Sequence, residues 1–145
     1  MNKIKIQEII EATGGRLLCG SLEDVVTGVR HDSRECEAGD LFVAIIGENQ
    51  DAHRYIPQVL EKGCRAVLVS QEGEWLESAK EKNAAVILVE DTVYAMGDLA
   101  RYYLDTLDVT KIAVTGSVGK TSVRDMIYYV LNEKYRCGRN LKNFN

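Results

Sequence analysis

Short apolar runs alternate with amphipathic segments along most of the chain. Three runs are continuously apolar and bounded by polar or glycine residues, at positions 41–46, 66–69 and 84–89. Such runs are typical of strands buried on both faces. Two shorter strands are predicted at 16–19 and 25–29. Helices are predicted where apolar residues recur at helical spacing, at 6–12, 55–62 and 75–82. Strands that alternate with helices predict an α/β fold.

The pattern changes slightly after Asp91. Thr92 is a suitable cap for a helix whose apolar positions are Met96, Leu99, Ala100, Tyr103 and Leu104. A polar connection then leads to a predicted strand at 112–114, a glycine loop and a helix. This last helix carries Val123, Ile127, Val130 and Leu131 on one face. We therefore expect two domains, a small one over 1–91 and the start of a second over 92–145.

Composition narrows the class of protein. The 145 residues are 46% hydrophobic and 28% charged, with a formal net charge of −4, as expected for a soluble globular protein. No block of lysine and arginine provides the basic face of a generic nucleic-acid binder. The chain has no apolar run of signal-peptide or membrane-span character, so membrane insertion is not expected. Its four cysteines show no C-x-x-C spacing, which favours reduced thiols in the cytoplasm.

The strongest chemical signal is a shortened phosphate-binding loop. It differs from the long G-x-x-x-x-G-K-[ST] pattern, whose first glycine would fall at Val114. Two glycines let the backbone curl around a phosphate, and the following helix presents N–H groups and a positive dipole end. The alternative is a glycine-bearing turn with an incidental lysine, but the preceding strand and following helix favour nucleotide binding. The predicted ATP site comprises Thr115, Gly116, Ser117, Val118, Gly119, Lys120, Thr121 and Ser122.

This loop resembles the T-G-x-x-G-K-[ST] motif of the Mur ligases and of the folylpolyglutamate synthetases. Two further stretches, His31-Asp32-Ser33-Arg34 and the A-G-D-L-F-V-A segment at 38–44, are similar to the N-terminal domain of Mur ligases alone. Within that family, the D-A-H at 51–53, Ser117 and the K-N-F-N at 142–145 resemble the members that add a dipeptide. The resemblance covers nearly the whole chain.

The resemblance implies a site for each substrate. The N-terminal domain would hold the UDP end of the substrate, with His31 and Ser33 near the uridine. The diphosphate or sugar would lie near Glu48, Asn49 and Gln50. Arg34 could meet a phosphate, although pairing with Asp32 or Asp40 is the expectation from the residues alone. From those residues, the 32–34 segment also reads as a simple turn with an internal ion pair, and Asp51 and His53 are expected to fix the loop before the next helix.

The implied reaction is ATP-dependent ligation. ATP would activate the carboxylate of UDP-N-acetylmuramoyl-tripeptide as an acyl phosphate, which the amine of D-alanyl-D-alanine attacks. Lys120 and Thr121 would be catalytic. Lys120 would stabilise charge on the phosphoryl group, and the Thr121 hydroxyl would join the coordination of Mg²⁺. Asn143 and Asn145 would approach the nucleotide or peptide. The resemblance further implies that the chain is an N-terminal portion of the ligase. A third-residue-adding Mur ligase and a non-catalytic module that binds a UDP-sugar or nucleotide are the alternatives.

Overall fold

The computed structural model describes residues 3–140, so the predicted roles of Asn143 and Asn145 lie outside the described residues. The chain divides into two compact units, Met1–Leu107 and Asp108–Asn145. The first unit contains a sheet with helices on both faces, and the described part of the second contains helix α5 (Lys120–Asn132) with its flanking segments.

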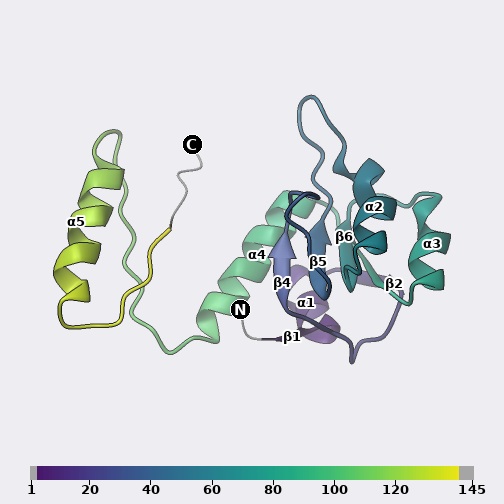
Figure 1. Cartoon of the computed structure of the whole chain (residues 1–145), viewed down its shortest axis with the longest axis horizontal. Helices are drawn as coiled ribbons and strands as arrows, with labels where there is room; N and C mark the ends of the chain where they lie inside the picture. Colours follow the sequence, from purple (N-terminus) through teal and green to yellow (C-terminus); the bar gives the residue numbers. More distant parts are fainter. Residues whose placement is uncertain (1–2, 141–145) are drawn as a thin grey trace. The chain divides into compact units, whose positions relative to one another are not determined.

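The main sheet is five-stranded and mixed. Its strand order is β2 (Arg16–Cys19), β7 (Ala85–Leu88), β6 (Ala66–Val69), β5 (Asp40–Val43) and β4 (Gly28–Arg30). Strands β4 to β7 run parallel, whereas β2 is antiparallel to β7 (Figure 1). A separate two-stranded ladder joins β1 (Ile4–Lys5) to β3 (Val25–Val26). The predicted α/β fold is confirmed.

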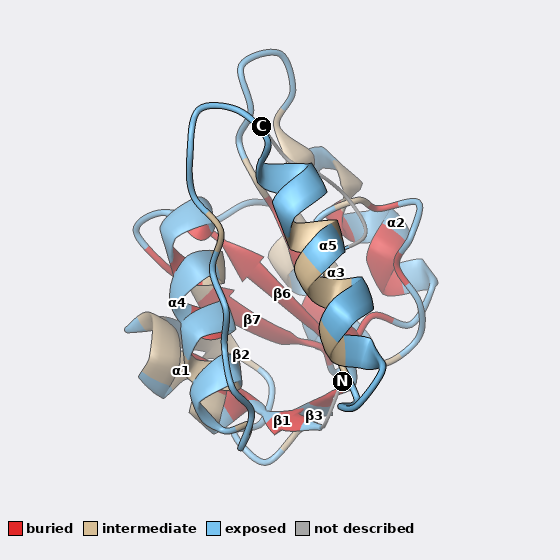
Figure 2. Ribbon diagram, turned by 90° about the vertical axis from the view of Figure 1, so that its left-hand side faces the viewer, coloured by how far each residue is buried: buried red, intermediate tan, exposed pale blue. Residues whose placement is uncertain are grey.

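Each face of the sheet supports its own apolar core, because successive side chains of a strand point to opposite faces. Leu41 and Val43 of β5 pack with buried residues of α1 (Ile6–Thr13) and α4 (Thr92–Asp105). Phe42, which lies between them, packs on the other face with α2 (Ile56–Glu61) and α3 (Trp75–Glu81). The central strands β5, β6 and β7 are accordingly buried, whereas β2 and β4 at the sheet edges are not; Figure 2 shows β6 and β7 as buried.

Three predictions differ from the structure in detail. The predicted strand over 25–29 is divided at Thr27, and its halves β3 and β4 belong to different sheets. The helix predicted over 55–62 is preceded by a 3₁₀ turn, η1 (Ala52–Tyr55). Thr92 does not cap α4. Instead, the Asp91 carboxylate accepts hydrogen bonds from the N–H groups of Val93 and Tyr94, at 2.7 and 3.0 Å.

The first compact unit extends beyond the predicted domain boundary near Asp91. Helix α4, which the sequence assigned to the second domain, packs against α1 and buries Ala95 and Leu99 in the core of the first unit. The Thr92 hydroxyl, itself buried, donates a hydrogen bond to the carbonyl of Ala44 at 3.0 Å. The apolar face of α4 thus packs on the sheet formed by the preceding residues, and the first unit ends at Leu107.

The predicted strand over 112–114 is absent from the described part of the chain, although the helix that follows it is present. Ile112 is 57% exposed, and α5 has no buried residue. A strand requires a partner for its backbone groups. Within residues 3–140, segment 112–114 pairs with no other strand and belongs to no sheet.

Candidate functional site

Two candidate loops follow neighbouring parallel strands. His31 comes directly after β4, and the loop 44–51 comes directly after β5. Parallel strands end at the same edge of a sheet, and ligands of α/β proteins bind beyond such carboxyl ends. In Figure 1 the loop after β5 projects beyond the ends of the β4 and β5 arrows. The fold therefore places both groups of predicted UDP-site residues at one edge of the sheet.

The turn after β4 is held by an ion pair. Arg34 donates from Nε to Asp32 Oδ1 at 2.9 Å and from Nη2 to Asp32 Oδ2 at 2.6 Å. Its backbone N–H also donates to Asp32. The Arg34 side chain and this backbone bond hold the pKa of the Asp32 carboxyl well below its usual range. The expected pairing of Arg34 with Asp32 is confirmed, while Asp40 pairs with Arg30.

A residue that the sequence did not indicate also holds this turn. The ammonium of Lys62, at the C-terminal end of α2, donates to the carbonyl oxygens of Ser33 at 2.7 Å and Arg34 at 3.3 Å. Ser33 is 9% exposed, whereas His31 is exposed. A lysine so far along the chain gives no sequence signal for such a contact, because Lys62 reaches the turn only through the packing of α2 in the folded protein.

The loop after β5 forms a tight turn with polar side chains at its tip. The Gly47 N–H donates to the Gln50 carbonyl at 2.8 Å, and Ile46 forms an antiparallel bridge with Asp51. Glu48, Asn49 and Gln50 are exposed. The hydroxyl of Tyr55 donates to Gln50 Oε1 at 3.3 Å. This tip presents amide and carboxylate groups to solvent.

Asp51 and His53 anchor that loop, as expected from the sequence. Asp51 Oδ1 accepts from the His53 N–H at 2.9 Å and contacts His53 Nδ1 at 2.5 Å. His53 Nε2 accepts from the Ser70 N–H at 3.2 Å, so the ring proton lies on Nδ1. Burial alone would raise the pKa of Asp51, but the bonds from His53 and Gln71 lower it. The loops after β5 and β6 are joined through this buried imidazole.

The predicted phosphate loop lies in the second unit. Gly116 and Gly119 have φ angles of 150° and 79°, a range that favours glycine. Gly119 is the N-cap of α5, so the loop leads directly into the first turn of the helix. The Lys120 ammonium returns to donate to the Gly116 carbonyl at 2.8 Å.

The residues of this loop fit a phosphate group. A Cβ at Gly119 would have no neighbour within 4 Å, and one at Gly116 would meet only the Val118 carbonyl at 3.7 Å. The loop is therefore open, and the exposed Thr121 lies on the same first helical turn as Lys120. Within residues 3–140, no group of three or more histidine, cysteine or acidic side chains could hold a metal ion. The Mg²⁺ contact at the Thr121 hydroxyl stays a prediction.

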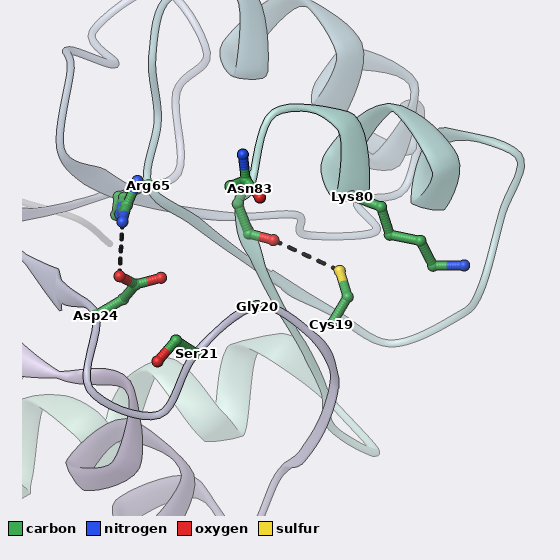
Figure 3. Close-up of a pocket in the computed structure, with 8 residues that line it drawn as sticks. Cys19, Gly20, Ser21, Asp24, Arg65, Lys80 and Asn83 are labelled. Carbon is green, nitrogen blue, oxygen red and sulfur yellow. Dashed lines mark hydrogen bonds and ion pairs between the residues drawn. The ribbon is translucent and has the colours of Figure 1, made fainter.

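The hollows of the first unit lie away from the predicted UDP-site residues. The one in Figure 3, of about 430 Å³, is near the amino ends of β6 and β7. Its cations are already paired, since Arg65 contacts Asp24 at 2.6 Å and Lys80 contacts Glu77 at 2.6 Å. The second, of about 610 Å³, is lined by acidic residues at the start of α4. Neither hollow includes a predicted site residue.

Relatives of the chain are enzymes of one family. The chain is 40% identical to the UDP-N-acetylmuramoyl-tripeptide–D-alanyl-D-alanine ligase of Bacillus subtilis, over 100% of this chain and 31% of that enzyme. It is 34% identical to the UDP-N-acetylmuramoyl-L-alanyl-D-glutamate–2,6-diaminopimelate ligase of Phocaeicola vulgatus, over 86% of this chain and 25% of that enzyme. The chain thus spans about a third or less of the length of these relatives.

Solved structures of MurF enzymes are also similar to this chain. MurF from Acinetobacter baumannii is similar with a TM-score of 0.80 and 29% identity, over 92% of this chain and 28% of that one. MurF ligase from Thermotoga maritima in complex with ADP has a TM-score of 0.65 and 31% identity, over 75% of this chain and 24% of that one.

Among residues 3–140, none of the helices has the length and apolar character that a membrane span requires.

A family model closes the comparison. The model described as "Mur ligase family, catalytic domain" matches residues 25–104, which is more than half of the chain and runs from β3 into α4. The chain belongs to the Mur ligase family.

Proposed function

We propose that the protein containing this chain adds D-alanyl-D-alanine to UDP-N-acetylmuramoyl-tripeptide, with ATP as the energy source, in peptidoglycan synthesis. The observation that carries the proposal is the phosphate loop at the start of α5 in a member of this family. Gly119 caps the helix in the left-handed conformation, and Lys120 follows at its first position. The choice of the dipeptide-adding reaction is supported by 40% identity to the Bacillus subtilis enzyme along the whole chain.

The loop provides the groups that a nucleotide phosphate requires. The N–H groups of the first turn of α5 and the positive end of its dipole attract an anion. Lys120 exchanges its bond to the Gly116 carbonyl for phosphate oxygens, and the hydroxyl of Thr121 contributes to Mg²⁺ binding. ATP, when bound, supplies the phosphoryl group that activates the substrate carboxylate. Thr115, Ser117, Val118 and Ser122 complete the walls of the loop.

The edge formed by β4 and β5 would hold the UDP end of the substrate. Ser33 and His31 lie in the turn after β4, where hydroxyl and imidazole groups can donate to and accept from a uracil and its ribose. Glu48, Asn49 and Gln50 lie at the tip of the loop after β5 and suit a sugar or diphosphate. Arg34 keeps its bond to Asp32 and acts on an anionic substrate through its charge.

The third-residue-adding reaction is a second candidate. It is favoured by 34% identity to the diaminopimelate ligase of Phocaeicola vulgatus, over 86% of the chain. The two reactions share the UDP end and the ATP site, so the residues described here serve either one. They differ in the peptide length of the substrate and in the amine that attacks.

A direct assay separates the two reactions. The full-length parent enzyme would be given ATP, Mg²⁺ and either UDP-N-acetylmuramoyl-tripeptide with D-alanyl-D-alanine, or the UDP-dipeptide with diaminopimelate. Release of ADP and the mass of the product report the reaction. We expect turnover with the first pair. Turnover with the second pair alone would replace the proposal with its alternative, and no ligation with either would refute both.

Lys120 provides a matched test of the ATP site. Lys120→Ala in the parent enzyme should lower the rate of ADP release by about 10²-fold or more, because one preorganised charge is lost from the phosphoryl group. The affinity for the UDP-tripeptide, measured by calorimetry, should change by less than about threefold, an estimate from the typical additivity of distant sites. Lys134→Ala, at an exposed lysine beyond α5, is the control. Equal losses in both measurements would contradict separate sites.

A further inference from the structure

Two buried cysteine thiols lie close together next to the turn after β4. Cys36 lies in the connection from β4 to β5 and is 5% exposed. Cys64 lies just before β6 and is 4% exposed. The Cys36 thiol donates to the carbonyl of Asp32 at 3.6 Å, and the Cys64 thiol donates at 3.7 Å to the carbonyl of Glu37, the residue next to Cys36. Both cysteines belong to the same apolar cluster on one face of the sheet.

The electrostatic surroundings distinguish the two thiols. The neighbouring Cys64 thiol lowers the pKa of Cys36; burial and Asp40 oppose this effect, and the charges of Lys62 and Arg30 assist it. The Cys36 thiol and burial raise the pKa of Cys64. Cys36 is therefore the thiol of the pair that more readily becomes the nucleophilic thiolate. Cys64 stays protonated and donates to the carbonyl of Glu37.

The connection that contains Cys36 is a largely exposed, irregular segment. In the connection that contains Cys36, the neighbouring residues Arg34, Glu35, Glu37 and Ala38 are all exposed. The connection has no helix or strand of its own between β4 and β5. Local opening of such an irregular segment needs less free energy than global unfolding, so a small oxidant can reach the thiols.

We propose that Cys36 and Cys64 form a reversible oxidation site that hydrogen peroxide converts to a disulfide. The Cys36 thiolate attacks one peroxide oxygen, the O–O bond breaks, and hydroxide leaves to give a sulfenic acid. The Cys64 sulfur then attacks the Cys36 sulfur, forming the S–S bond and releasing water as the Cys64 proton and the sulfenic hydroxyl depart. In total, two thiols and one peroxide give one disulfide and two waters.

The disulfide would act on the turn that carries the predicted uridine residues. A disulfide bond is about 2.05 Å long, shorter than a non-bonded contact between sulfur atoms. Its formation removes the thiol hydrogens that face the carbonyls of Asp32 and Glu37. We expect the turn containing Ser33 to shift and its affinity for the uridine end of the substrate to fall. This consequence, unlike the oxidation itself, rests on the proposed function.

Peptide mapping of the unmodified 145-residue chain tests the oxidation. The chain would be treated with hydrogen peroxide, alkylated and digested with trypsin without reduction. Cleavage after lysine and arginine places Cys36 in peptide 35–54 and Cys64 in peptide 63–65. We expect these two peptides to appear joined, two hydrogens lighter than their sum, and to separate after dithiothreitol. Cys19 and Cys137 are internal controls, since both are more exposed than the pair. Oxidation of Cys19 or Cys137 with peptides 35–54 and 63–65 left unjoined would overturn the proposal.

Variants and a binding measurement complete the design. Cys19→Ser with Cys137→Ser should leave the cross-link unchanged, and Cys36→Ser and Cys64→Ser should each abolish it. Binding of uridine diphosphate to the reduced and the oxidised chain reports the consequence, with an expected loss of about tenfold, or 1.4 kcal/mol. No binding by the reduced chain would count against the proposed uridine site and leave the oxidation result standing. Equal binding by both forms would refute the effect of the disulfide on the turn.

Discussion

The adjacent residues Asp91 and Thr92 have different roles at the start of α4. The Asp91 carboxylate accepts from two N–H groups of the first turn, while the Thr92 hydroxyl is buried and donates to the Ala44 carbonyl. The sequence predicts Thr92 as the cap, because threonine favours this position, and aspartate favours it as well. Which of the two caps the helix depends on how α4 meets the sheet, since the hydroxyl that reaches Ala44 is unavailable to the helix end.

Asp91→Ala should therefore destabilise the first unit. The two N–H groups of Val93 and Tyr94 would lose their protein acceptor, at a cost of about 1 kcal/mol. Asp98→Ala, at an exposed carboxylate within the same helix, is the control and should change stability by less than about 0.5 kcal/mol. Urea denaturation of the 145-residue chain, followed by circular dichroism, measures both changes. Equal effects would show that Asp91 does not act as a cap.

Residue chemistry predicted the contacts that are local in sequence. The Asp32–Arg34 pair and the bond of Asp51 to His53 span two positions each, so residue type and spacing were sufficient. The contact of Lys62 with Ser33 and that of the Cys64 thiol with the carbonyl of Glu37 link segments that only the fold brings together. No spacing rule indicates them, because an intervening strand and helix separate the partners.

The elements of the first unit were predicted better than the element before the phosphate loop. Continuous apolar runs and helical periodicity report burial within the same unit, and β6 matches its predicted residues fully. The apolar segment 112–114 gave the same signal, yet it pairs with no strand in the described chain. An apolar run indicates that a segment can be buried. A ladder also requires a neighbouring strand.

Helix α4 shows why the first compact unit extends beyond the predicted boundary. Its apolar positions were recognised, but amphipathicity does not indicate which sheet the apolar face meets. In the structure that face buries Ala95 and Leu99 beside Ile9 of α1 and Leu41 of β5. The burial of these side chains therefore stabilises α4 as part of the first unit.

A comparison of two truncated chains, residues 1–107 and residues 1–91, tests whether α4 belongs to the first unit. Residues 1–107 should fold alone and protect the amides of β5, β6 and β7 from hydrogen exchange. Residues 1–91 lack α4 and expose Leu41 and Ile9 to water, at a cost of about 1.5–3 kcal/mol for each large side chain. A few such losses approach the whole stability of a small domain, about 5–15 kcal/mol. We expect uniformly faster exchange in the shorter chain. Equal protection in both would show that α4 is dispensable and favour the earlier boundary.

At the scale of the whole molecule, the two units hold different parts of the predicted chemistry. The first unit buries a core on each face of its sheet and presents the predicted UDP-site residues on loops anchored by buried contacts. The second unit carries the phosphate loop on a helix without buried residues, where Met126 and Val130 are 67% and 71% exposed. An apolar helix face of this kind is stabilised by packing against further elements. We therefore expect the proposed uridine binding to be more robust in this chain than the proposed nucleotide binding.

The 145-residue chain alone should have no ligase activity. A phosphate loop supplies only part of a nucleotide site, and this chain spans 31% of the Bacillus subtilis enzyme to which it is similar. Segment 112–114, which leads into the loop, belongs to no sheet, so the donors of the loop lack the fixed support on which electrostatic stabilisation depends. The chain would be incubated with ATP, Mg²⁺, UDP-N-acetylmuramoyl-tripeptide and D-alanyl-D-alanine, and ADP and the ligated product would be measured. We expect values equal to those of a Lys120→Ala control, while the uridine diphosphate affinity of the two chains stays the same. Turnover clearly above that control would show that the phosphate loop and the first unit are sufficient for catalysis.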